Sequence, residues 1–254
     1  MGQFICFSVI FLVLTRSAFG QINELSQLEK RINSSIEAAY AASVRIWGFD
    51  TIRQTQNSSQ FSGVVVSHEG HILTVSHAIV PGRIYKVRFP DGKEVIAIAL
   101  GRIGLAQKQN RPDLGMMKII GTGAWPVAKM GWSYSSKVNE SCIGISYPEK
   151  LNQLLPTVRF GRITNVMDQW DFVESTCKME PGDSGGPLFD VEGRVVALHS
   201  RCNEPEEENF EVPVDMYRKY WTALNTPEDY KILPADTDDV KKDPITDSHW
   251  RRHL

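Results

Sequence analysis

Ser184 lies in a glycine-rich stretch that could present its hydroxyl for chemistry. Glycines at positions 182, 185 and 186 surround it, and this density of glycine permits a tight turn that another main chain can approach closely. Backbone N–H groups of a Gly-x-Ser turn can point into one concavity, which is what a developing oxyanion needs in an acyl transfer. A serine hydroxyl is a weak nucleophile until a base takes its proton, so a base and an acid must lie elsewhere in the chain.

Two residues upstream can supply that base and that acid. His77 stands where an apolar segment breaks off into Ser-His-Ala, and Asp113 follows a proline and precedes another apolar segment. Taken singly, each also fits a structural role, as a buried histidine and a turn aspartate. With Ser184 they follow the order His, Asp, Ser, which is one of the chain orders of a serine triad. The combination therefore predicts nucleophilic catalysis at Ser184.

The elements that must position these residues are short strands. Between residues 43 and 215 apolar residues alternate with polar ones, and turn-forming residues recur about every ten positions. Helical periodicity is found only near the two ends, over residues 21–42 and from about 216 to 224, where Asp215 is placed to cap the second helix. This pattern predicts an all-β fold, either a barrel or a sandwich, with one helix at each end. Two such sets of strands, at about 43–125 and 135–215, suggest two antiparallel β-barrels.

The termini suggest export. Residues 4–14 are apolar and too few to span a bilayer, and Ala18-Phe19-Gly20 offers a cleavage site, so residues 1–20 read as a signal peptide. The first residues contain no Lys or Arg, and an uncleaved anchor is the alternative. A secreted or periplasmic protein is expected, with no membrane contact after cleavage. Residues 225–254 are charged, lack a core pattern and are predicted to be a flexible tail.

Three cysteines remain after the signal peptide, and an exported protein can form disulfides. The odd number suggests one bridge and one free thiol. We expect Cys177 to be in the bridge, and Cys142 and Cys202 are both possible partners. None of the three has the paired C-x-x-C spacing of a zinc site, so we expect no metal and no other cofactor. The formal net charge of −2 gives no case for a nucleic-acid partner.

Several segments resemble the trypsin-like serine peptidases. Residues 182–187, Gly-Asp-Ser-Gly-Gly-Pro, are the nucleophile motif of that family, and 73–78, Leu-Thr-Val-Ser-His-Ala, are similar to its Leu-Thr-Ala-Ala-His segment. The strand opening at 113–119 resembles the family's segment around its acid. The short spacing between these motifs, and the segment 210–217, are closest to the bacterial HtrA-type branch. The resemblance covers residues 42 to 224.

This resemblance implies a chymotrypsin-like fold of two six-stranded antiparallel β-barrels and hydrolysis of polypeptide substrates through an acyl-enzyme. It implies Ser184 as nucleophile, His77 as general base and then acid, and Asp113 as the group that fixes the imidazole tautomer. The N–H groups of Gly182 and Ser184 would form the oxyanion hole. Oligomeric state does not follow from the sequence.

The chain also departs from its nearest relatives at Asp183. HtrA-type enzymes usually have Asn at this position and carry a PDZ domain downstream, whereas about thirty residues follow Leu224 here. Trypsins bind a newly cut N-terminus with the counterpart of Asp183, but no Ile-Val-Gly-Gly segment precedes Val44. The sequence therefore does not identify what satisfies the charge of Asp183.

The resemblance places the substrate pocket near residues 178–181 and 198–201. His199, Ser200 and Arg201 are the expected substrate-binding residues. A histidine at this position is similar to glutamyl endopeptidases of the superfamily, and Arg201 adds positive charge, so an acidic residue before the scissile bond is one hypothesis. Preference for a small aliphatic residue, as in HtrA-type enzymes, is the other.

Two further functions fit parts of the sequence. The stretch around Ser184 also matches Gly-x-Ser-x-Gly, the nucleophile elbow of α/β-hydrolase esterases, although that fold needs long helices between its strands. A non-catalytic β-barrel binding module that keeps the peptidase scaffold is the second alternative, because an intact triad does not guarantee an open oxyanion hole.

Overall fold

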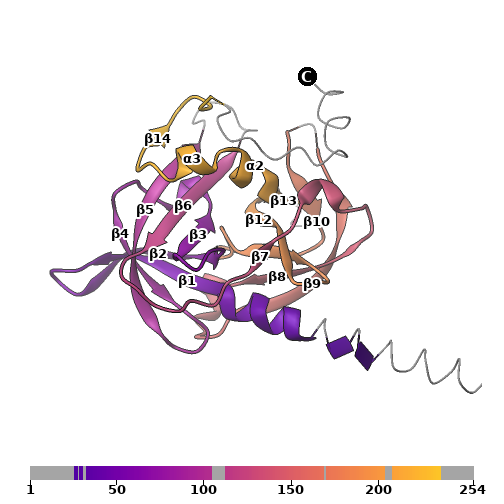
Figure 1. The fold of residues 1–254 in the computed structure, drawn as a ribbon, viewed down its shortest axis with the longest axis horizontal. Helices are drawn as coiled ribbons and strands as arrows, with labels where there is room; N and C mark the ends of the chain where they lie inside the picture. Colours follow the sequence, from indigo (N-terminus) through magenta and orange to yellow (C-terminus); the bar gives the residue numbers. More distant parts are fainter. Residues whose placement is uncertain are drawn as a thin grey trace, which may run out of the picture.

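The computed structural model describes residues 26–27, 29–30, 33–104, 112–168, 170–203 and 208–235. Six strands form the first barrel, which Figure 1 shows in indigo and magenta. They are β1 (Ser43–Asp50), β2 (Thr55–Val65), β3 (His71–Thr74), β4 (Ile84–Arg88), β5 (Glu94–Gly104) and β6 (Asp113–Ile119). The strands pair antiparallel in the order β5-β4-β1-β2-β3-β6, and a further pairing of β5 with β6 closes the barrel.

The second barrel repeats this arrangement with the later part of the chain. Its strands are β8 (Ser141–Ser146), β9 (Thr157–Asn165), β10 (Val173–Ser175), β11 (Pro187–Asp190), β12 (Arg194–Asn203) and β13 (Glu208–Pro213). They pair antiparallel in the order β11-β8-β9-β10-β13-β12, and β11 with β12 completes the closure. The predicted all-β fold of two six-stranded antiparallel barrels is therefore confirmed, and the helices between strands that an α/β-hydrolase esterase requires are not found in the described residues.

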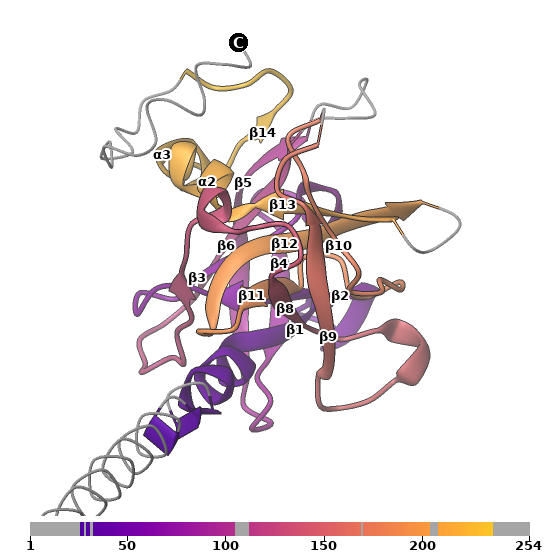
Figure 2. The same cartoon turned by 90° about the vertical axis from the view of Figure 1, so that its right-hand side faces the viewer.

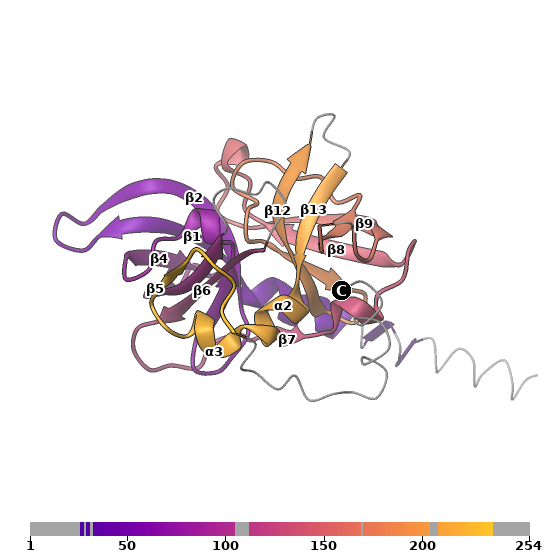
Figure 3. The ribbon, with the colours of Figure 1, turned by 90° about the horizontal axis from the view of Figure 1, so that it is seen from above.

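Short elements extend and connect the barrels. Two-residue parallel strands lie beside one strand of each barrel: β14 (Asp229–Tyr230) pairs with β5, and β7 (Lys129–Met130) pairs with β12. Residues 33–42 form a helix that leads directly into β1. The helices α2 (Val214–Lys219) and α3 (Trp221–Leu224) follow β13 and run along one side of both barrels, as Figure 3 shows. Single turns η1 (Ser76–Ala78), η2 (Ser133–Ser135) and η3 (Glu149–Leu151) complete the described elements.

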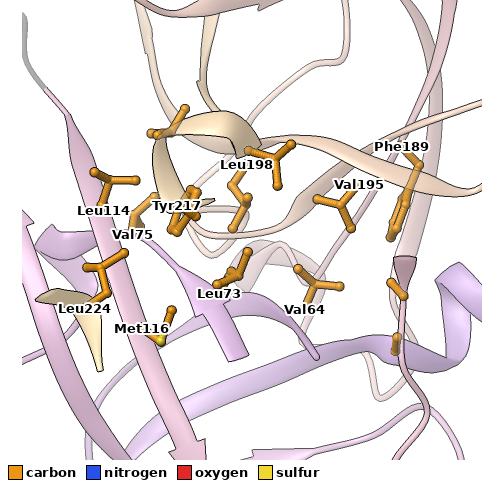
Figure 4. Packing of buried hydrophobic residues seen from close by; sticks show 14 of the residues in the cluster. Val64, Leu73, Val75, Leu114, Met116, Phe189, Val195, Leu198, Tyr217 and Leu224 are labelled. Carbon is orange, nitrogen blue, oxygen red and sulfur yellow. The ribbon is translucent and has the colours of Figure 1, made fainter. Parts of the chain in front are cut away.

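One apolar cluster joins the two barrels. Its members include residues of β2, β3, β5 and β6 of the first barrel, of β8, β11, β12 and β13 of the second, and of α2 and α3, and Figure 4 shows part of the cluster. Tyr217 of α2 is fully buried in this cluster and donates a 2.6 Å hydrogen bond to the carbonyl of Thr74. Because Thr74 ends the strand that precedes η1, the packing between the barrels also fixes the position at which the chain turns toward His77.

The C-terminal segment differs from the expected flexible tail. Residues 226–235 are described, and they form β14 and place Tyr230 and Leu233 against the apolar cluster between the barrels. Figure 2 shows this segment leaving α3 and passing beside β5. Its docking depends on tertiary contacts that a charged, aperiodic sequence does not reveal. The predicted signal peptide and residues 236–254 of the predicted tail lie outside the described residues.

The predicted disulfide is not formed. None of Cys142, Cys177 and Cys202 is in a disulfide, and Cys202 is exposed. Cys142 and Cys177 are neighbours inside the second barrel, but their sulfur atoms are 3.9 Å apart, about twice the length of an S–S bond. The expectation of a bridge at Cys177 is therefore corrected to a buried pair of thiols. In the described part of the chain no helix is long and apolar enough to cross a membrane.

Candidate active site

The pairing of β3 with β6 brings His77 and Asp113 together. The two strands are antiparallel, with Thr74 opposite Gly115, so the end of β3 lies beside the beginning of β6. His77 is in the turn η1 directly after β3, and Asp113 is the first residue of β6. Two residues that are separated by thirty-five others in the sequence thereby form one hydrogen-bonded contact.

Asp113 accepts four hydrogen bonds. Its Oδ2 lies 2.7 Å from His77 Nδ1 and accepts a 2.8 Å bond from the hydroxyl of Ser200. Its Oδ1 accepts a 2.6 Å bond from the hydroxyl of Ser76 and a 3.1 Å bond from the backbone N–H of His77. The carboxylate therefore holds both the ring and the main chain of His77, and it selects the tautomer that carries its proton on Nδ1 and leaves Nε2 free to accept one.

These contacts move both pKa values. Burial raises the pKa of Asp113, but its bonds from His77, Ser76 and Ser200 more than compensate and lower the pKa to about 2. Burial also lowers the pKa of His77, whereas the hydrogen bond and the negative charge of Asp113 raise it, and the net result is a pKa above the ordinary value. The positive charge of Arg201 acts in the opposite direction. Asp113 is therefore ionised at neutral pH and favours the protonated form of His77.

The turn around Ser184 is shaped by two glycines. Gly182 has φ +98° and Gly185 has φ +82°, values that side-chain-bearing residues rarely adopt. A Cβ on Gly182 would also lie 2.5 Å from the carbonyl oxygen of Tyr147. The first barrel holds the turn from the other direction, because the N–H of Ser62 donates to the carbonyl of Ser184 at 2.9 Å and its hydroxyl donates to that of Gly182 at 2.8 Å.

In this turn, the N–H groups of Gly182 and Ser184 donate no hydrogen bond to the described residues. Ser184 is half-buried. Among the hydrogen bonds of the described residues, none uses the N–H of Gly182 or of Ser184 as a donor, and none joins Ser184 to His77. Such bonds commonly tighten only when substrate is present. Two backbone N–H groups that donate no hydrogen bond, next in sequence to a serine hydroxyl, are suited to bind an oxyanion.

Arg159 neutralises Asp183. Asp183 has no exposed surface, and its Oδ2 lies 3.0 Å from Nη1 of Arg159 on β9. Ser146 donates its hydroxyl to the same carboxylate at 2.8 Å, and so does the N–H of Glu180, also at 2.8 Å. Arg159 further binds the side chain of Glu180 through Nη2 at 3.0 Å. A cation within the chain therefore fixes the residues immediately before Ser184.

Sequence reasoning did not identify Arg159, although a signal for it existed. Asp183 immediately precedes the candidate nucleophile in a segment expected to pack closely, and a buried carboxylate needs a cation or several donors. The chain contains many arginines, and only the antiparallel register of β8 and β9, which places Gly144 opposite Arg159, selects this one.

The expected substrate-binding residues have separate environments. Ser200 turns its hydroxyl toward Asp113, and Arg201 lies over the ring of Phe172 at 4.7 Å. His199 has no exposed surface and places Nδ1 3.4 Å from the equally buried Glu211. Burial lowers the pKa of His199, but Glu211 more than compensates and the pKa is raised. In this conformation His199 therefore faces a carboxylate of its own chain and offers no surface to a substrate.

Comparison with known proteins identifies the family. The model of a trypsin-like peptidase domain matches residues 61–198, which is more than half of the chain. The chain belongs to the trypsin-like peptidase domain family. This span contains all three candidate catalytic residues, His77, Asp113 and Ser184, and both glycines of the nucleophile turn.

Relatives of similar sequence agree with this assignment, and solved structures share the fold. A probable periplasmic serine endoprotease, DegP-like, from a Marinomonas species is 31% identical over 59% of this chain and 31% of its own length. One of the same description from Pseudomonas fluorescens is 29% identical over 68% of this chain and 37% of its own length. The chain therefore spans about a third of these relatives. The serine endoprotease from Yersinia pestis superimposes with a TM-score of 0.64 at 24% identity, covering 76% of this chain and 66% of that one. The HtrA-type protease AlgW with tripeptide gives 0.62 at 22% identity, covering 76% and 63%.

The contact between Arg159 and Asp183 predicts a large effect on stability. Arg159→Met keeps most of the apolar stem but leaves a buried carboxylate without its cation, so we expect the free energy of unfolding to fall by about 3 kcal/mol. Chemical denaturation followed by tryptophan fluorescence measures this. Arg162→Met, at an exposed position on the same strand, is the matched control and should change stability by less than about 0.5 kcal/mol. Equal losses in the two variants would contradict a specific role for Arg159.

Proposed function

We propose that this chain is a serine endopeptidase that cleaves polypeptides through an acyl-enzyme on Ser184, with His77 as base and Asp113 as the residue that orients it. One observation carries the proposal: the buried, ionised Asp113 binds both the ring and the main chain of His77. The positive φ angles of Gly182 and Gly185 in the turn of Ser184 are consistent with it. Membership of the trypsin-like peptidase domain family supports the same chemistry. The names of the relatives support a periplasmic or secreted location and a polypeptide substrate.

The proposed steps follow from the geometry. Asp113 keeps the imidazole proton on Nδ1, so Nε2 of His77 takes the proton of Ser184 as the hydroxyl oxygen attacks the carbonyl carbon of the substrate. The N–H groups of Gly182 and Ser184 bind the oxyanion of the tetrahedral intermediate. The imidazolium, stabilised by Asp113, then protonates the leaving amine. A water molecule repeats the sequence on the acyl-enzyme and releases the acid.

Asp183 contributes to this mechanism through its position between Gly182 and Ser184. Its carboxylate is held by Arg159, Ser146 and the N–H of Glu180, so the main chain that supplies both oxyanion donors is fixed by groups of the same chain. In the proposed mechanism, these contacts hold the oxyanion donors in place before substrate binds, without a newly cut N-terminus. This preorganisation favours the peptidase over the alternative of a non-catalytic binding module.

Replacement of the nucleophile tests the reaction. Ser184→Ala should abolish covalent labelling by a phosphonate that reacts with activated serines, and should lower kcat by roughly four to six orders of magnitude. Mass spectrometry of the labelled protein and turnover of a fluorogenic peptide measure the two effects. Ser135→Ala is the control, because Ser135 lies in the turn η2 and donates its exposed hydroxyl to the carbonyl of Trp132. Undiminished turnover in Ser184→Ala would refute the assignment.

The raised pKa of His77 predicts the pH dependence of kcat/KM. His77 must be neutral to accept the proton of Ser184, so activity should rise with pH through an apparent pKa above about 6.5. Removing the positive charge in Arg201→Gln stabilises the protonated imidazole, so the rising part of the pH profile of kcat/KM should move to higher pH. Arg162→Gln should leave it in place. A limb that moves to lower pH in Arg201→Gln would contradict the proposed role of His77.

The burial of His199 predicts substrate preference. Because His199 faces Glu211 and has no exposed surface, we expect a small aliphatic residue before the scissile bond and no acidic preference. Peptides that differ only in Val or Glu at that position, assayed from about pH 5.5 to 8.5 with wild type and His199→Ala, measure this. Val should be preferred throughout. A Glu preference that fades with rising pH and disappears in His199→Ala would instead show that His199 recognises a carboxylate.

A further inference from the structure

In addition to Asp113, a second charged residue binds the turn that carries His77. Arg102 lies on β5 of the first barrel, and its Nη1 donates a 2.6 Å hydrogen bond to the carbonyl of Ile79. The same nitrogen is 3.4 Å from the carbonyl of Ser76. These carbonyls lie on either side of His77 in the chain. The guanidinium therefore fixes the main chain before and after the proposed base, while Asp113 binds the intervening N–H and the ring.

The other end of this guanidinium is held by the C-terminal segment. Nη2 of Arg102 donates a 2.6 Å bond to Oδ2 of Asp229 on β14. The backbone repeats the contact, because Asp229 lies opposite Arg102 in the parallel pairing of β14 with β5 and the N–H of Arg102 donates to the carbonyl of Glu228 at 2.9 Å. Figure 1 shows β14, in yellow, at the edge of the first barrel beside β5. A residue 152 positions later than His77 thus takes part in holding its turn.

The segment fits this site closely. A Cβ on Gly101, the neighbour of Arg102, would lie 2.7 Å from the carbonyl oxygen of Thr226 and 2.8 Å from that of Ala223. Only glycine at this point of β5 allows the chain after α3 to approach so near. Tyr230 and Leu233 then pack on the apolar cluster between the barrels. Backbone pairing, close approach and apolar packing all place Asp229 at the guanidinium.

The charged groups around this contact keep it intact across the working pH range. The hydrogen bond from Arg102 is the main cause that lowers the pKa of Asp229 to about 2, and Lys231, whose Nζ is 2.7 Å from the same carboxylate, acts in the same direction. Asp229 is therefore ionised at any pH at which His77 is neutral. The contact responds to displacement of the segment and not to protonation.

We propose that Asp229 is a positioning residue for the catalytic base. It binds Arg102, which holds the turn of His77, so the position of His77 depends on the docking of residues 226–235. The proposal rests on the proposed function only in taking His77 as the base. Without a carboxylate partner, the guanidinium would be drawn toward water and its hold on the carbonyls of Ser76 and Ile79 would loosen. Any event that lifts residues 226–235 from β5 would then lower the rate of the chemical step.

Substitutions at Asp229 separate position from charge. Asp229→Ala removes the acceptor and should lower kcat about tenfold at unchanged KM, since a small misplacement of a catalytic group has effects of this order or larger. Asp229→Asn keeps an oxygen that Arg102 can bind, and should retain at least half of the wild-type kcat. Glu94→Gln is the matched control, because Glu94 lies on the same strand and forms an exposed 3.0 Å pair with Arg88; it should behave as wild type.

A measurement that needs no turnover makes the test independent of the proposed function. The pKa of His77, followed by NMR of its imidazole, should fall toward the ordinary value in Asp229→Ala, because a displaced turn weakens the bond to Asp113, and should stay near wild type in Asp229→Asn and Glu94→Gln. If Ser184→Ala showed that the chain is no peptidase, this shift would still report on the positioning.

Three results would overturn the proposal. The first is a wild-type kcat and His77 pKa in Asp229→Ala. The second is an equal loss of kcat in the Ala and Asn variants, which would indicate a charge effect. The third is a loss of kcat in Asp229→Ala with an unchanged pKa of His77, or one fully explained by the unfolded fraction from a denaturation curve, which would indicate a purely structural role.

Discussion

The buried carboxylate of Asp113 is the interaction on which the site depends. An ionised group with almost no exposed surface is costly unless it is paired and hydrogen-bonded, and Asp113 meets this requirement with four donors. Three of them come from the turn that carries His77, and the fourth, Ser200, comes from the second barrel. The barrels must therefore meet in one register for the carboxylate to be satisfied, and that register also brings the turn of Ser184 beside the first barrel. The stability of the interface and the geometry of the site follow from the same contact.

The apolar cluster between the barrels enforces this register. Leu73 and Val75 lie on the same face of the chain and pack in the apolar cluster, and the carbonyl of Thr74 between them accepts the hydroxyl of Tyr217, so the segment that leads to His77 is anchored in the core. On the other side, Ser62 binds the carbonyls of Gly182 and Ser184. Proteins place reactive groups on loops that a rigid scaffold positions, and here each loop that carries a candidate catalytic residue is bonded to the scaffold within two residues of that side chain.

The sequence was sufficient for the fold and for naming His77, Asp113 and Ser184 as candidates, because these features have local signatures: alternating apolar residues, regular turns, and a glycine-rich motif around Ser184. It was insufficient where a residue's role depends on its partner. Neither the pairing of Asp183 with Arg159 nor the burial of His199 against Glu211 can be found without the strand register, and a two-residue strand such as β14 is too short to show periodicity. The wrong prediction of a disulfide at Cys177 has a similar origin, because the number of cysteines says nothing about the distance between two sulfur atoms.

Two arginines hold the two reactive turns, and their surroundings differ. Arg159 binds a carboxylate with no exposed surface, in the same network as Ser146 and Glu180, whereas the carboxylate partner of Arg102 is 31% exposed and belongs to a short strand at the edge of the first barrel. Because local opening occurs most readily where few buried contacts resist it, the turn of Ser184 is the fixed half of the site and the turn of His77 is the half that can be adjusted. In the proposed peptidase, a base whose turn can shift beside oxyanion donors that stay in place would change the rate of the reaction and leave the affinity for the substrate unchanged.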